Sequence, residues 1–169
     1  YALGNLLHVG LPSGKTIDYL IDGLGRRVGK KVNGALVAQW VYRDGLHPIA
    51  ELSATGALVA QYVYGVRGNV PDYVLRDGKT YRIVADHLGS PRLVVDVATG
   101  IVAERIDYDE WGNVTNDMTP AWMPFGFAGG IYDSDTGLVR FGARDYDADV
   151  GRWTGKDPVL FRGKQANIY

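Results

Sequence analysis

Two ten-residue stretches of this chain alternate apolar and polar side chains in almost the same order. NGALVAQWVY begins at Asn33, and TGALVAQYVY begins 22 residues later at Thr55. Because successive side chains of a β-strand point to opposite faces, this alternation favours strands. A related segment, IVAERIDY, follows Gly100 and ends at Tyr108. The pattern therefore predicts strands that recur along the chain with a fixed period.

Turn residues recur with the same period. A D-x-x-G-like turn falls about half a period away from each repeated glycine, as in DGLG from Asp22 and DEWGN from Asp109. Turn signals thus arrive too often for helices of three turns, and they predict one β-hairpin per 22 residues. Asn-Gly and Asp-Gly, two of the glycine turns, are typical of type I′ hairpin turns, which need positive φ at both central residues. The repeated glycines are Gly34, Gly56, Gly78 and Gly100.

Neither face of these strands is uniformly apolar. In the two repeated segments, one face carries Leu, Ala, an aromatic residue and Tyr, and the other carries Ala, Val, Gln and Val. A β-sandwich needs one dry face, so we expect a wall one sheet thick that is wetted in part on both sides. Tyrosines at matching positions are expected to stack as a ladder, each cross-strand pair contributing ~0.2–1 kcal/mol. The ladder residues are Tyr19, Tyr42, Tyr64 and Tyr108.

Composition narrows the functional classes. The 169 residues are 46% hydrophobic and 22% charged, which fits one ordinary domain with a core. The net charge is −1, with Lys and Arg spread along the chain, so no nucleic-acid or anionic-membrane partner is expected. No apolar stretch approaches the ~20 residues of a membrane span. The absence of cysteine excludes disulfides, Cys-ligated zinc and a thiol nucleophile.

Several motifs resemble the YD repeats of Rhs proteins and the core domain associated with those repeats. YLIDGLGRR, which begins at Tyr19, resembles a YD repeat. DHLGSPRLVVD from Asp86, YDEWGNVT from Tyr108 and the stretch from Phe127 to Pro158 follow the Rhs repeat-associated core domain in order. The resemblance covers most of the chain from about residue 19 onward.

The resemblance implies a hollow shell whose wall is a spiralling β-sheet and which encloses a variable C-terminal effector, often a toxin. Residues 1–115 would then be YD-type hairpin repeats, and residues 116–169 a truncated core segment. The implied partners are the enclosed effector polypeptide and neighbouring repeats of the same shell, and no cofactor is implied. A secreted or cell-surface protein of bacterial origin is expected. The related teneurin shells are adhesive, so binding to a cell-surface partner or a glycan is the alternative.

The family resemblance also implies a possible enzymatic role for the parent protein. In toxin-complex members, an aspartyl autoprotease uses an arginine in an ARxYD motif and an aspartate in the DP that follows, which correspond here to Arg144 and Asp157. The second aspartate belongs to a D-P-x-G-L motif beyond the N-x-Y segment at which this chain stops. Such an autoprotease needs two carboxyl groups, because one must be ionised to activate water while the other stays protonated. Self-cleavage is therefore expected only of a longer parent, and both residues could instead make structural contacts.

Three tryptophans of the C-terminal half are candidates for a ligand platform, because aromatic faces can stack on sugar rings. These are Trp111, Trp122 and Trp153, and the alternative for them is packing inside the core domain. No metal site is expected, because the D-x-D-x-D-x-G run from Asp145 lacks the Gly and Glu positions of a calcium loop. His87 lies near Ser90, but no nucleophile-elbow motif accompanies them.

Overall fold

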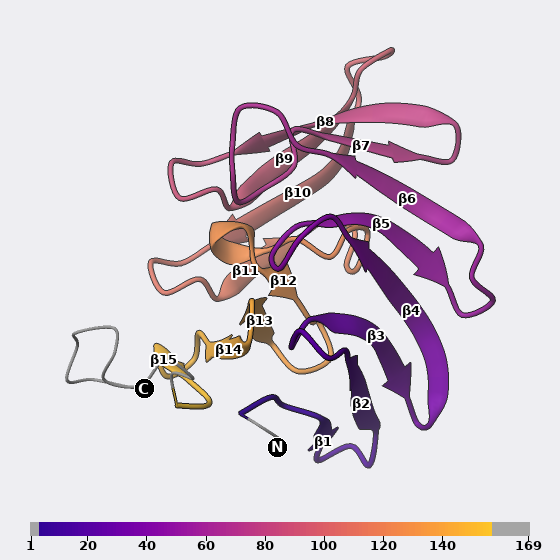
Figure 1. Ribbon diagram of the computed structural model, residues 1–169. Coiled ribbons are helices and arrows are strands. Elements are labelled where there is room, and N and C mark those ends of the chain that lie inside the picture. The colour runs from indigo at the N-terminus through magenta and orange to yellow at the C-terminus, as the bar shows by residue number, and fades with distance from the viewer. Residues whose placement is uncertain (1–3, 157–169) are drawn as a thin grey trace.

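The computed structural model describes residues 4–156, which form two antiparallel sheets and no α-helix (Figure 1). The first, called here the long sheet, contains β1 (His8–Gly10), β2 (Thr16–Ile21), β3 (Arg27–Val32), β4 (Ala35–Tyr42), β5 (Pro48–Ser53), β6 (Leu58–Val63), β7 (Tyr73–Arg76), β8 (Lys79–Ala85), β9 (Pro91–Asp96), β10 (Val102–Tyr108) and β11 (Val114–Asp117). The second sheet contains β12 (Ile131–Tyr132), β13 (Leu138–Phe141), β14 (Arg144–Asp147) and β15 (Arg152–Trp153). A single 3-10 turn, Phe127–Gly129, precedes the second sheet.

Every strand of the long sheet pairs with its neighbours in sequence, in the order β1 to β11, and the sheet does not close. It bends into an arc that runs from β1 through β7 and β8 to β11, and the second sheet lies within the hollow of this arc (Figure 1). The prediction of an all-β array of hairpins in a curved sheet is confirmed. The expected division after residue 115 falls inside β11, and the long sheet ends at Asp117.

The turns between strands follow from residue chemistry. Asn33 and Asp77 adopt positive φ of 49° and 52° ahead of their glycines, because short polar side chains tolerate the left-handed region. The β-branched Thr55 and Thr99 do not adopt positive φ, so they do not form two-residue turns with their glycines. Their loops are longer, and Gly56 donates its N–H to the Ser53 carbonyl. All four repeated glycines have φ between 73° and 83°, namely Gly34, Gly56, Gly78 and Gly100.

The D-x-x-G turns at the other end of the hairpins share one device. In each, an aspartate carboxylate accepts hydrogen bonds from two backbone N–H groups further along the turn, at 2.9–3.1 Å. These bonds close the turn locally, which explains why aspartate recurs at its start. The carboxylates belong to Asp22, Asp44, Asp86 and Asp109.

The tyrosines of the expected ladder do not stack on one another. Within residues 4–156, no ring–ring contact joins any two of them. The reason is geometric: one 22-residue period contains two strands, so equivalent tyrosines lie at least two strand spacings, or about 9–10 Å, apart. An arginine guanidinium covers each ring instead, with Arg27 over Tyr19 at 3.5 Å, Arg26 over Tyr42 at 5.4 Å, Arg43 over Tyr64 at 5.3 Å and Arg92 over Tyr108 at 5.5 Å.

The two faces of the long sheet differ more than the sequence pattern indicated. One face is buried where Met123 and Phe125, from the segment after β11, pack on it. The residues beneath them are Ala60, Tyr62, Val74, Tyr81, Ile83, Val94 and Ile106. Valines that alternate with this set, such as Val63 and Val84, are each 45% exposed. The expectation of a wall wetted on both sides is therefore wrong for this part of the sheet.

Candidate functional site

The contact between the two sheets is held by several ion pairs, some of them fully buried. Cationic side chains of β3 and of the turn before β2 meet aspartates of the second sheet and of the loop after β12. Lys30 bridges Asp133 and Asp135 with its Nζ 2.6 Å from each carboxylate, and Lys15 reaches Asp135 at 2.8 Å. Segments more than 100 residues apart in the sequence are thus held together by charge.

Asp145, in β14, is at the centre of this contact. Its carboxylate accepts hydrogen bonds from Arg27 at 2.7 Å and from Arg140 at 2.8 Å, and all three residues are at most 3% exposed. The register of β13 and β14 places Arg140 directly opposite Asp145, whereas Arg27 comes from β3 of the long sheet. Burial lowers the pKa of Arg140, while the neighbouring Asp145 opposes this shift. The three groups form a buried Arg–Asp–Arg cluster that joins the sheets.

All three guanidinium nitrogens of Arg140 make hydrogen bonds. Its guanidinium donates to the Gly25 carbonyl at 2.9 Å and to the Gly142 carbonyl at 2.6 Å, and it contacts the Asn5 side-chain oxygen. Burying a charge is costly unless it is paired and hydrogen-bonded, so these bonds are what make the buried position of Arg140 possible. Arg140 thereby ties the turn before β3 to the second sheet.

Tyr19 belongs to the same contact. Its hydroxyl donates to the Asp133 carboxylate at 2.7 Å, and the Arg27 guanidinium lies over its ring. Burial, followed by the negative charge of Asp133, raises the pKa of Tyr19 well above its ordinary value. A tyrosine that the repeat pattern assigned to a ladder therefore joins the two sheets.

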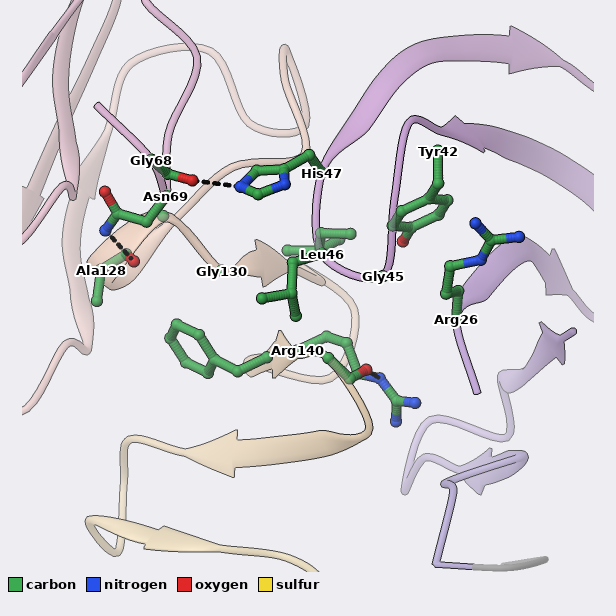
Figure 2. Close-up of a pocket in the computed structure, with 14 residues that line it drawn as sticks. Arg26, Tyr42, Gly45, Leu46, His47, Gly68, Asn69, Ala128, Gly130 and Arg140 are labelled. Carbon is green, nitrogen blue, oxygen red and sulfur yellow. Dashed lines mark hydrogen bonds between the residues drawn. The ribbon is translucent and has the colours of Figure 1, made fainter. Parts of the chain in front are cut away.

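A cavity of about 230 Å³ lies beside this contact (Figure 2). Tyr42, Leu46 and His47 of the repeats face Gly130 and Arg140 across it. His47 contacts the Gly68 carbonyl, and Asn69 donates to the Ala128 carbonyl at 3.0 Å, as Figure 2 shows. Both lining arginines are already paired, Arg26 with Asp22 and Arg140 with Asp145. The cavity is thus a joint between elements, with its charged groups committed to structure.

Only one of the two candidates for self-cleavage lies within the described residues. Arg144 lies in β14, with its guanidinium 4.0 Å from the centre of the Trp153 ring. Asp157 lies outside the described residues. The adjacent residue in the same ARDYD motif, Asp145, is the one that enters the buried cluster.

The three candidate tryptophans lie in different surroundings. Trp122 packs edge-on against Tyr81 at 4.9 Å, with the Arg76 guanidinium over its ring. Trp153 contacts Phe141 and Tyr146, each at 5.7 Å between ring centres. Trp111 is 58% exposed. No ring contact within residues 4–156 joins any two of them, so a shared platform is not formed there.

Sequence reasoning missed Arg27, Arg140 and Asp145 as site residues. Two of them lie inside motifs that the sequence shows, Arg27 in YLIDGLGRR and Asp145 at the variable position of the ARxYD motif, which was the available signal. Arg140 carries no motif of its own, and only the β13–β14 register reveals its role. Among residues 4–156, no group of three or more acidic or histidine side chains could hold a metal ion, and no helix there could cross a membrane.

Known proteins resemble this chain in sequence and in fold. A family model of the Teneurin YD-shell matches residues 2–167. Teneurin-1 of Mus musculus is 37% identical over 160 residues, which cover 92% of this chain and 6% of that protein. Double-stranded DNA deaminase toxin A of Burkholderia cenocepacia (strain H111) is 33% identical over 150 residues, covering 86% of this chain and 10% of the toxin.

A solved structure supports the fold. The crystal structure of TcdB2-TccC3-TEV superimposes with a TM-score of 0.65 at 19% identity, covering 95% of this chain and 9% of the other. The chain thus spans a tenth or less of each of these relatives. The family match covers nearly all of the chain and agrees with the open hairpin sheet and the sequence motifs, so the chain belongs to the Teneurin YD-shell family.

Proposed function

We propose that this chain is a wall segment of a YD-repeat shell that encloses a C-terminal effector polypeptide. Its role is structural: the long sheet forms the wall, and β1 and β11 are open edges to which neighbouring repeats of the same shell can pair. The observation that carries the proposal is the buried Arg27–Asp145–Arg140 cluster, which fixes the second sheet in the hollow of the curved wall.

Enclosure acts physically, because a polypeptide inside a shell cannot reach its substrate. Two relatives bear on this: one is named a deaminase toxin, and the solved neighbour is a TcdB2-TccC3 assembly. We propose a secreted or cell-surface location for the parent protein on the same basis. The described residues act as scaffold and not as an enzyme in this proposal.

Protease protection of the full-length parent protein tests enclosure. With an epitope at its C-terminus, we expect the effector region to survive proteinase K while the shell is native. The same region expressed alone, as the control, should be digested. Equal digestion of the two would overturn enclosure and favour the adhesive alternative.

For Arg144 and Asp157 we propose a role in self-cleavage only where the parent supplies the second aspartate. The support is the match of both residues to the family motif. Mass spectrometry of the parent, purified without protease inhibitors, should show a C-terminal fragment in the wild type and none in Asp157→Asn. An identical pattern in both proteins would make Asp157 a structural residue.

A further inference from the structure

The second sheet presents a different set of side chains on each face. The registers of β13, β14 and β15 place Arg140 and Asp145 on one face, which carries the buried cluster that joins the two sheets. Phe141, Tyr146 and Trp153 lie on the other face. This aromatic face is therefore not used by the cluster.

A groove of about 410 Å³ opens on the aromatic face. It is lined by the half-buried rings of Phe127, Phe141, Tyr146 and Trp153, and no charged side chain of residues 4–156 lines it. The Tyr146 hydroxyl is already bound, since it donates to the Trp111 carbonyl at 2.9 Å. The groove thus offers the surface of aromatic rings, which favours an apolar occupant.

The rings that line the groove hold one another in place. Tyr146 stacks on Phe127 with the ring centres 6.2 Å apart. Trp153 meets the edges of Phe141 and Tyr146, each at 5.7 Å between ring centres. Because these rings are positioned before an occupant arrives, little side-chain entropy is lost when one binds.

The chain itself carries an apolar run close to the groove. Thr154 donates its N–H to the Asp145 carbonyl at 2.8 Å, which holds the chain beside β14 just after Trp153. The sequence after Lys156 reads DPVLFRGKQANIY, and its longest run of large apolar residues is VLF, residues 159–161. These residues lie outside the described part of the chain.

The run is tethered to the groove by a short length of chain. The six residues from Trp153 to Val159 span at most about 22 Å when extended. A short tether of this kind gives an effective concentration on the order of millimolar. An apolar run held at that concentration beside an apolar groove is its most available occupant.

We propose that the aromatic groove binds residues 159–161 of the same chain, with their apolar side chains packed on the rings of Phe141, Tyr146 and Trp153. The contact would fix the path of the chain as it leaves the second sheet. The proposal goes beyond the role of the chain as a wall, and it is tested without the enclosed effector.

Nuclear magnetic resonance of the 169-residue protein tests the contact directly. We expect nuclear Overhauser effects between the methyl groups of Val159 or Leu160 and the ring protons of Trp153 or Tyr146, with the methyl signals shifted upfield by the rings. Effects from Ile168 in place of residues 159–161 would assign the groove to another segment and overturn the proposal. Their absence here, with ring contacts that appear only in the full-length parent protein, would assign the groove to the effector and also overturn it.

Trypsin cleavage after Arg162, followed by mass spectrometry of the released C-terminal peptide, gives a second readout. The double variant Leu160→Gln/Phe161→Gln should speed this cleavage at least about tenfold, because burial of one leucine or phenylalanine side chain contributes that factor or more. The matched control Ala166→Gln/Ile168→Gln, which also adds two glutamines to the segment, should leave the rate unchanged.

The groove is tested from its other side by Trp153→Ala, which should speed the same cleavage by a similar factor. If this variant disrupts β15, the substitutions at residues 160 and 161 still decide, because those residues lie outside the second sheet. An unchanged rate in the Leu160→Gln/Phe161→Gln variant, or an equal increase in its control, would overturn the proposal.

Discussion

The two sheets of this protein are specified in different ways. Each strand of the long sheet pairs with the next strand in sequence, through turns closed by aspartate or glycine. The second sheet reaches its place through contacts between residues far apart, such as Tyr19 with Asp133 and Arg27 with Asp145, which are 114 and 118 positions apart. Local chemistry therefore builds the wall, and long-range buried charge fixes what lies in its hollow.

This difference has an energetic side. Breaking a buried ion pair is costly because the remaining charge stays in a medium of low polarity, whereas a turn contributes through the backbone conformation of a few residues. Substitutions at the sheet contact should therefore destabilise more than substitutions in the repeat turns.

The largest effect is expected from Asp145→Ala. It leaves the guanidinium groups of Arg27 and Arg140 buried without their counter-charge, and should lower the free energy of unfolding by about 3–5 kcal/mol. Urea unfolding followed by tryptophan fluorescence measures this. Asp149→Ala, at an exposed position of the same region, is the matched control. A loss no greater than in the control would refute the assignment of the cluster as the main link between the sheets.

The next effect concerns Glu104, in β10, whose carboxylate accepts the N–H of Thr119 where the chain leaves the long sheet. Burial raises the pKa of this carboxyl from 4.5 to about 7, and the nearby Asp117 adds to the shift. The stability that protonation confers is thus complete below about pH 4.5 and is lost as the pH rises through about 7.

Glu104→Gln keeps the acceptor oxygen and removes the titration. At pH 8 it should be more stable than the wild type, by an amount on the order of 2 kcal/mol, and the difference should shrink toward pH 4.5. Glu110→Gln, an exposed neighbour, provides the comparison. Parallel curves of stability against pH for the wild type and Glu104→Gln would contradict the raised pKa of this buried carboxyl.

A smaller effect is expected within a repeat turn. Gly56 has φ of 83°, and a Cβ there would meet no heavy atom within 4 Å, so the cost of Gly56→Val is purely conformational. We expect a loss of about 1–2 kcal/mol, against less than about 0.5 kcal/mol for Val63→Thr on the exposed face of β6. Gly100→Val, at φ of 73°, should behave like Gly56→Val. Equal urea midpoints for the glycine variants and Val63→Thr would argue against the turn assignment.

The smallest effect separates two tyrosines at equivalent strand ends. Tyr42 donates its hydroxyl to the Arg27 carbonyl at 2.9 Å, whereas the buried hydroxyl of Tyr108 has no partner within residues 4–156. Tyr42→Phe should therefore cost about 1 kcal/mol, and Tyr108→Phe should be neutral or slightly stabilising. Thermal unfolding of both variants side by side measures the contrast, and a larger loss in Tyr108→Phe would reverse it.

Much of the long sheet could be predicted because its information is local. The 22-residue spacing of Gly34, Gly56 and Gly78 located the turns, and alternation located the strands between them. The same repeat misled the prediction of a tyrosine ladder, since a period of two strands separates equivalent rings by more than a contact distance.

The polar contact between the sheets could not be read in the same way. Nothing near Arg140 in the sequence shows that it faces Asp145, because their pairing depends on the register of β13 and β14. Nor does the YLIDGLGRR motif distinguish Arg26, paired with Asp22 of its own turn, from Arg27, which reaches the second sheet. A strand turns successive side chains to opposite faces, so these neighbours acquire different partners only once both sheets are in place.

By itself, then, the sequence determined the hairpin period, the turns and membership of the YD-repeat shell class, all of which depend on residues close together in the chain. Only the tertiary structure decided which face of the wall is covered, which arginines are buried, and that Phe127 and Trp153 share a groove. The physical reason is range. Turn chemistry acts over a few residues, whereas burial and charge pairing act between surfaces that meet only after the chain has curved.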